Sequence, residues 1–136
     1  MQVLLMNVPY EVSFRAVPTS VREARETVAT AASQLGAGRG VVDDVKLCVS
    51  EAATNIVRHA YREDRGELRI RVESRGDELT VIVRDEGVGL EVFQREGELG
   101  HGLRIMERLA KRFAITSLPN AGTEVLMVFP LPTRVR

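Results

Sequence analysis

The stretch that decides the fold is "SEAATNIVRHAY", residues 50–61. In a helix, Glu51 and Asn55 lie four residues apart and therefore on the same face. If that face meets solvent, the pair is an ordinary part of an exposed helix. If it meets a pocket, the pair places a carboxylate beside a carboxamide, which suits a base and a metal ligand. The helix alone leaves both interpretations open.

The faces of this helix differ in character when each residue is given about 100° of rotation. An apolar arc, expected to face the core, holds Val45, Val49, Ala52, Ala53, Ile56 and Ala60. A polar arc holds Asp44, Cys48, Glu51, Asn55, Arg58 and His59. Asparagine is a poor helix former, which hints at a further role for this arc. His59 is assigned none, because a histidine on a helix surface is more often structural.

Composition limits the possible classes of protein. The 136 residues suit a single domain, 1–136, and 44% hydrophobic with 28% charged residues is typical of a globular chain. The 19 basic and 19 acidic residues balance, which argues against direct nucleic-acid binding. The apolar run near the start, "VLLM" at 3–6, is too short for a membrane span. The single cysteine excludes an internal disulfide and fits a cytoplasmic location.

The first half of the chain predicts one strand and two helices. "YEVSFRAV", residues 10–17, alternates as a strand does. Ser20 followed by Glu23 has capping-box spacing, which predicts a helix from Ser20 to Leu35. The helix that contains the opening stretch is expected over 41–61.

The second half predicts two hairpins separated by a glycine-bearing loop and a helix. The strands are expected in "GELRIRVES", "LTVIVRDEG", "FAITSL" and "TEVLMVFPL". The loop covers 86–102, with one helical turn at 91–95, and the helix is "LRIMERLAKRF" at 103–113. Three helices and about five strands predict an α+β fold: a two-layer α/β sandwich with a mixed, mostly antiparallel sheet and helices on one face.

One loop follows a strand that is expected to be buried, in "VIVRDEGVGL" at 81–90. Asp85 closes that strand, and its carboxylate can accept a hydrogen bond from an amino group. Gly87 and Gly89 would let the backbone approach a flat ring closely. A plain turn is the alternative, because Asp and Gly are common in turns.

Another glycine pair precedes the third helix, in "GELGHGLRIM" at 97–106. Gly100 and Gly102 at a helix entrance would present free N–H groups to an anion. A flexible connector is the alternative. The stretch is neither a Walker A loop nor a dinucleotide-binding fingerprint, because the required lysine and glycine spacings are missing.

The order of these motifs is more specific than any one of them. E-x-x-x-N, D-x-G-x-G, G-x-G and a late Gly122-Thr123 together resemble the GHKL ATPase superfamily of gyrase, heat-shock-90 chaperones, histidine kinases and mismatch-repair ATPases. "EAATNIVRHAY" and "GHGLRIM" are similar to the bacterial anti-sigma-factor serine kinases. The resemblance covers residues 10–130 and implies a Bergerat-type ATP-binding fold. No dimerisation-and-phosphotransfer helix pair precedes the motifs, which predicts a free-standing kinase.

The resemblance implies a role for each motif in binding Mg-ATP. Asn55 would coordinate Mg²⁺, whose shell is completed by phosphates and water. Glu51 would accept the proton of an incoming serine hydroxyl. Asp85 would bind adenine, with the Thr123 hydroxyl nearby. The glycines that would leave room for the nucleotide or form its phosphate lid are Gly87, Gly89, Gly100 and Gly102.

One departure from the family pattern concerns the charge near the lid. Kinases of this family often carry an arginine shortly before the lid glycines, whereas Glu98 and Leu99 occupy that stretch here. Arg95 or Arg104 could substitute for it. The resemblance therefore implies ATP binding more firmly than rapid phosphotransfer.

Three functions are compatible with the sequence. The first is a serine kinase that phosphorylates an anti-sigma-factor antagonist and sequesters a sigma factor, as a homodimer like many of its family. The second is a nucleotide-binding partner-switching module with little catalysis. The third, a purely structural α/β domain, does not account for the order of the motifs.

Overall fold

The computed structural model of this chain describes residues 9–63, 66–85, 98–118 and 122–132. The expected helical turn at 91–95 lies outside these residues. So do Gly87, Gly89 and Arg95. Within the described part, no helix combines the length and apolar character that a bilayer crossing needs.

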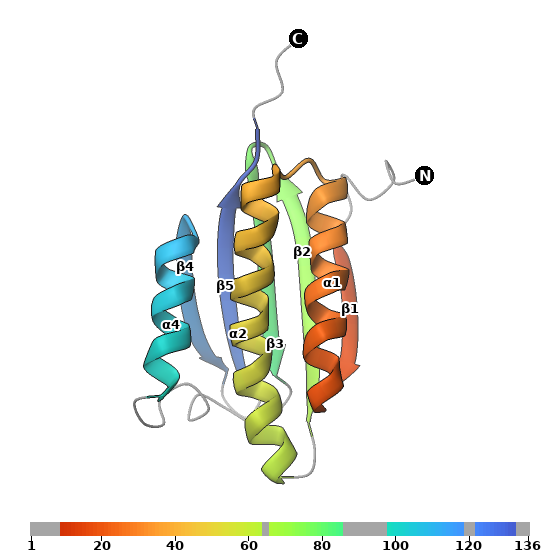
Figure 1. Cartoon of the computed structure of the whole chain (residues 1–136), viewed down its shortest axis with the longest axis vertical. Coiled ribbons are helices and arrows are strands. Elements are labelled where there is room, and N and C mark those ends of the chain that lie inside the picture. The colour runs from red at the N-terminus through yellow and green to blue at the C-terminus, as the bar shows by residue number, and fades with distance from the viewer. Residues whose placement is uncertain (1–8, 64–65, 86–97, 119–121, 133–136) are drawn as a thin grey trace.

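A five-stranded sheet forms one layer of the molecule (Figure 1). Its strands are β1 (Tyr10–Arg15), β2 (Glu67–Arg75), β3 (Glu78–Asp85), β4 (Arg112–Leu118) and β5 (Gly122–Pro130). Their order across the sheet is β1-β2-β3-β5-β4, and each neighbouring pair of these described strands is antiparallel. Both predicted hairpins, β2–β3 and β4–β5, are therefore present.

Among the described residues, the helices cover one face of this sheet (Figure 1). They are α1 (Pro18–Gln34), α2 (Arg39–Glu63) and α4 (Glu98–Leu109). α2 lies in the middle and packs against α1 on one side and α4 on the other. The predicted two-layer α+β fold is confirmed, and the sheet described here is antiparallel throughout.

The core lies between the two layers and follows the expected periodicities. Alternate strand residues point at the helices, and those that are completely buried include Leu68, Ile70, Val72, Leu79, Val81, Val83, Val125, Met127 and Phe129. The apolar arc of α2 meets them through Val45, Val49, Ala52, Ala53 and Ile56, which are also completely buried. This part of the predicted core arc is confirmed.

The start of α1 differs from the prediction. The helix begins at Pro18, with Val17 as its N-cap and no side-chain cap. Proline is favoured there because its φ suits a helix and its missing N–H would be unpaired anyway. Ser20 is buried inside the helix, and its hydroxyl donates a hydrogen bond to the carbonyl oxygen of Arg15 at 2.5 Å. The predicted Ser20 cap is wrong, and the side chain ties α1 to β1 instead.

The third helix is shifted relative to the predicted 103–113. α4 begins at Glu98 and ends at Leu109, so Gly100 and Gly102 lie inside it and not in a loop before it. At the other end, Arg112 and Phe113 belong to β4, where they pair with Val128 and Met127. Pairing with β5 satisfies their backbone groups in the sheet, and this tertiary contact overrides the helical pattern of the sequence.

Candidate functional site

Glu51, Asn55 and Gly102 meet where α4 packs on α2. A β-carbon at position 102 would lie 3.0 Å from Oε1 of Glu51 and 3.5 Å from Nδ2 of Asn55. Gly102 is itself buried, and only 7% of Asn55 is exposed. The interpretation in which both polar residues of α2 simply face water is therefore wrong for Asn55. The packing of α4 on this arc is the cause, and the only hint of it in the α2 sequence is an asparagine inside a helix.

The carboxamide of Asn55 is incompletely satisfied. Its Nδ2 is buried and has no hydrogen-bond partner among the described residues. A half-turn of the carboxamide would place Oδ1 at the same position, since the two atoms exchange by rotation. A buried polar atom without a partner costs stability, so this atom marks a place where a ligand could supply the missing interaction.

A second polar pair joins the end of β3 to the start of β5. Asp85 and Thr123 are completely buried. The backbone N–H of Thr123 donates a hydrogen bond to Oδ2 of Asp85 at 3.2 Å. Gly122, just before it, has a φ of 97°, which favours glycine. The Thr123 hydroxyl is buried without a partner among the described residues. This buried carboxylate beside an unpaired hydroxyl can bind a small polar group.

Both pairs lie at the same end of the molecule (Figure 1). The C-terminal half of α2, the first turns of α4, the last residue of β3 and the start of β5 gather there, and α2 packs on both strands. The structure thus brings Glu51, Asn55 and Gly102 together, and the ends of β3 and β5 that carry Asp85 and Thr123 lie at the same end of the molecule. Gly100 lies in the first turn of α4.

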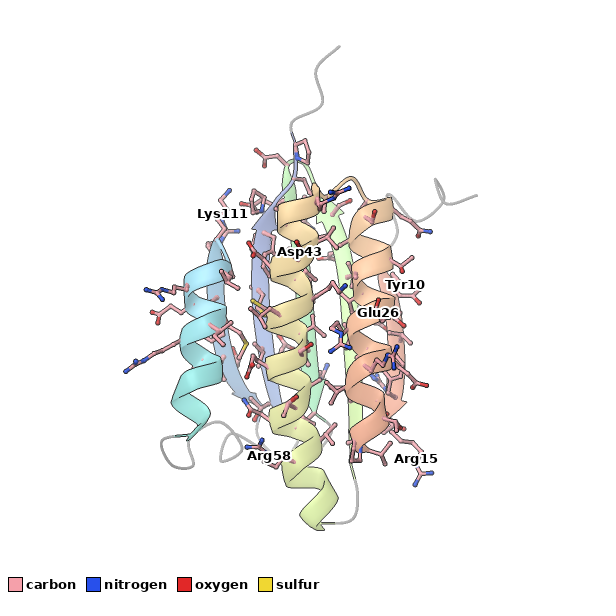
Figure 2. The ribbon with its side chains drawn as sticks, viewed as in Figure 1. Tyr10, Arg15, Glu26, Asp43, Arg58 and Lys111 are labelled. Atoms are coloured by element: carbon pink, nitrogen blue, oxygen red, sulfur yellow. The ribbon has the colours of Figure 1, made fainter. Side chains whose placement is uncertain are left out.

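Of the two arginines that the sequence suggested, only Arg104 lies among the described residues. Arg104 is two residues from Gly102, or about 200° around the helix. It is exposed and lines a hollow on the outer side of α4 with Glu107 and Arg108. It therefore points away from Glu51. Arg58 instead lies on the Glu51 side of α2, exposed near its C-terminal end (Figure 2). Its place seven residues after Glu51 is the sequence signal that puts it on this side of the helix.

Cys48 lies one turn before Glu51 and is completely buried. Burial, followed by the nearby charges of Asp44 and Glu51, raises the pKa of its thiol to about 12. The thiol is therefore protonated near neutral pH and is a poor nucleophile. Any proton transfer or nucleophilic chemistry at this end must use other groups.

The donor set limits what metal the site can hold. Among the described residues, no three His, Cys, Asp or Glu side chains gather as a metal cluster. The carboxamide oxygen of Asn55 is a ligand type that suits Mg²⁺, which takes few protein ligands and shares the rest of its shell with phosphates and water. The residues present fit a cation that arrives with a phosphorylated ligand.

This chain matches one protein-family model and resembles several known proteins. Residues 14–129 match the family described as "Histidine kinase-like ATPase domain". The chain is 34% identical over 128 residues to the "Anti-sigma F factor" of Clostridium acetobutylicum, covering 86% of this chain and 90% of that one. It is 42% identical over 91 residues to the "Serine-protein kinase RsbW" of Bacillus subtilis, covering 66% of this chain and 57% of the kinase.

A solved structure supports the same architecture. The crystal structure of RsbU and RsbW domains from Mycobacterium tuberculosis superposes with a TM-score of 0.71, over 93% of this chain and 33% of that one. The sequence identity is 21%, so the likeness concerns the fold.

Proposed function

Because the chain belongs to the histidine kinase-like ATPase family, and within it to the group of anti-sigma factors and serine-protein kinases, we propose that it is an anti-sigma-factor serine kinase. In this role it binds Mg-ATP, phosphorylates a serine of an anti-sigma-factor antagonist and sequesters a sigma factor in the cytoplasm. The membership itself was predicted from four motifs and is confirmed.

The observation that carries the proposal is the pair of buried polar atoms without partners at one end of the fold. Nδ2 of Asn55 and the hydroxyl of Thr123 occupy family motif positions and have no partner among the described residues. Buried polar groups are nearly always hydrogen-bonded. A nucleotide that spans this end would supply the missing partners to both.

The adenine ring of the nucleotide binds at the end of β3. The Asp85 carboxylate is held by the backbone N–H of Thr123 and accepts a hydrogen bond from the exocyclic amine of adenine. The Thr123 hydroxyl binds the same ring edge, directly or through water. A carboxylate selects adenine over guanine at this point, because guanine presents a carbonyl oxygen in place of the amine.

The phosphates of the nucleotide bind between α2 and α4. Bound Mg-ATP supplies a transferable γ-phosphoryl group whose charge is partly neutralised by the cation. Asn55 holds the cation. Glu51, one helical turn away, accepts the proton of the substrate serine. One rigid helix fixes both groups relative to each other, which suits a reaction that depends mainly on alignment.

Arg58 provides the positive charge that the sequence around the lid does not. It lies on the Glu51 side of α2, seven residues after Glu51, which is two turns along the same face. Its guanidinium offsets negative charge near the phosphates. It thereby substitutes for the arginine that the family often carries where this chain has Glu98 and Leu99.

The alternative is a partner-switching module that binds nucleotide and partner proteins with little catalysis. In either case the partners are a sigma factor and its antagonist, and the chain acts as a homodimer. The unusual acidic residue Glu98 is the observation that keeps this alternative in view, since it brings negative charge to the stretch before the lid glycines.

The deciding experiment measures transfer of radiolabelled phosphate from ATP to the cognate antagonist. That antagonist is first captured from native lysate with ADP or ATP and identified. Transfer to serine supports the kinase. Capture and nucleotide binding without transfer support the switching module. Absence of thermal stabilisation by ADP, expected to be about 2.7 kcal/mol at 100 times Kd, would contradict both.

A further inference from the structure

Two glycines inside helices have opposite surroundings. Gly40 lies in the first turn of α2, and a β-carbon there would have nothing within 4 Å. Gly102 lies within α4, and a β-carbon there would lie 3.0 Å from Oε1 of Glu51. Neither has the left-handed φ that glycine alone adopts easily. Glycine is a poor helix former, so at position 102 the reason for its presence is space.

The contact at Gly102 is directed at one group. Nδ2 of Asn55 and Cβ of Glu51 are each 3.5 Å from the missing β-carbon, which is ordinary van der Waals distance. The 3.0 Å to Oε1 is tighter than that. A methyl group at position 102 would therefore displace the carboxylate end of Glu51 and leave Asn55 nearly undisturbed.

We propose that Gly102 is a positioning residue for the Glu51 carboxylate, and the proposal rests on the kinase function given above. The bare backbone of α4 forms one wall of the space in which that carboxylate lies. Because Glu51 is the base, the volume at position 102 controls turnover. Adenine binding does not depend on it, since Asp85 and Thr123 are on β3 and β5. A purely phosphate-binding role for Gly102 would instead predict loss of nucleotide affinity.

The first test compares Gly102→Ala with Gly40→Ala. A misplacement of a reacting group by about 1 Å can cost about a hundred-fold in rate, and the 3.0 Å contact requires Oε1 of Glu51 to move by a few tenths of an ångström. Gly102→Ala should therefore lower kcat by up to about ten-fold while the Kd for ADP stays unchanged. Gly40→Ala should leave both quantities as they are. Full kcat in Gly102→Ala, or an equal loss of kcat and ADP affinity, would overturn the proposal.

The second test adds Glu51→Asp. The aspartate side chain is one methylene shorter, so its carboxylate lies farther from position 102. Adding Gly102→Ala in that background should lower the thermal unfolding midpoint less than it does in the wild type, and the two changes should be non-additive. Additive effects would overturn the proposal. If Gly102→Ala alone does not fold, recovery of a folded, ADP-binding protein by Glu51→Asp supports the contact, and failure of both variants to fold contradicts it.

These readouts separate the proposal from the kinase function. A wild-type chain that binds ADP but transfers no phosphate would refute the kinase function. The double-mutant cycle of thermal unfolding midpoints at positions 51 and 102 would still report whether Gly102 positions Glu51. Additive thermal effects in an active kinase would leave the function in place and remove the role of Gly102.

Discussion

β3 carries an acidic residue at each end, and the two have opposite surroundings. Glu78, at its start, accepts two hydrogen bonds from the Arg112 guanidinium at 2.9 Å each. It also forms an ion pair with Nζ of Lys111 at 3.0 Å. These groups lie at the surface, and Lys111 is at the end of the molecule opposite to Arg58 (Figure 2). Asp85, at the other end of the strand, is completely buried beside the Thr123 hydroxyl.

The difference is between an ion-paired carboxylate at the surface and a buried carboxylate, which the proposed function assigns to nucleotide binding. At the Glu78 end, the carboxylate is matched by two basic side chains and stays in contact with water. At the Asp85 end, polar groups are removed from water while a neighbouring hydroxyl has no described partner. Such an arrangement lowers stability, and proteins retain it where function requires it. Substitutions at the two ends should therefore change different properties.

The largest effect is expected for Glu51→Gln at the Asp85 end. The amide cannot accept the serine proton, so phosphotransfer should fall by about 10²- to 10⁴-fold. ADP affinity and the thermal midpoint should remain close to wild type, because the shape of the side chain is kept. Arg112→Gln, at the other end, is the control and should transfer phosphate normally. Unchanged transfer in Glu51→Gln would remove that residue from the base role.

Asp85→Asn should mainly affect nucleotide binding. Asparagine keeps an oxygen that can accept the Thr123 N–H, but the charge on the adenine acceptor is lost. Hydrogen bonds to charged groups contribute about 1.5–3 kcal/mol, so titration calorimetry should show ADP affinity lower by about ten- to a hundred-fold. Glu78→Gln, at the start of the same strand, should bind ADP like wild type. Equal affinity in the two variants would refute adenine recognition by Asp85.

The sequence predicted which side chains share a face, but it did not predict their burial. The four-residue spacing of Glu51 and Asn55 was enough to place them together, and the end of β3 was recognised from alternation followed by Asp and Gly. Whether the polar arc of α2 meets water depends on α4, which is distant in sequence. The same contact explains why Gly102 belongs to a helix and not to a loop.

The errors at element ends have a similar origin. Ser20 and Glu23 have the spacing of a cap, yet Pro18 starts the helix and Ser20 is used to hold β1. Phe113 continues the helical pattern of α4, yet pairing with Met127 places it in the sheet. Local patterns identified the helices and strands of the described residues, whereas tertiary hydrogen bonds decided where these two elements begin or end.

Thr123→Val tests the Asp85 end of β3 through the free energy of unfolding. Valine has nearly the same shape and removes a buried hydroxyl that lacks a described partner. We expect the free energy of unfolding of the nucleotide-free protein to rise by about 1 kcal/mol, while ADP affinity falls. Thr116→Val, at an exposed position of β4, is the control and should change neither property appreciably. A loss of stability in Thr123→Val would mean that the hydroxyl is already satisfied in the folded protein.

The smallest effect is expected at the Glu78 end, and it depends on pH. Hydrogen bonds from Arg112 and then Lys111 lower the pKa of Glu78 from 4.5 to about 2. Because the folded-state pKa is the lower one, the ionised carboxylate stabilises the fold above about pH 4.5, and this contribution is lost as pH falls from 4.5 towards 2. The denaturation midpoint of Glu78→Gln should therefore lie slightly below wild type at pH 7 and approach it at pH 3. Salt should shrink the difference at pH 7, since surface pairs are screened. A difference that is the same at both pH values would mean that Glu78 acts through packing and not charge, and the contrast with Asp85 would then rest on burial alone.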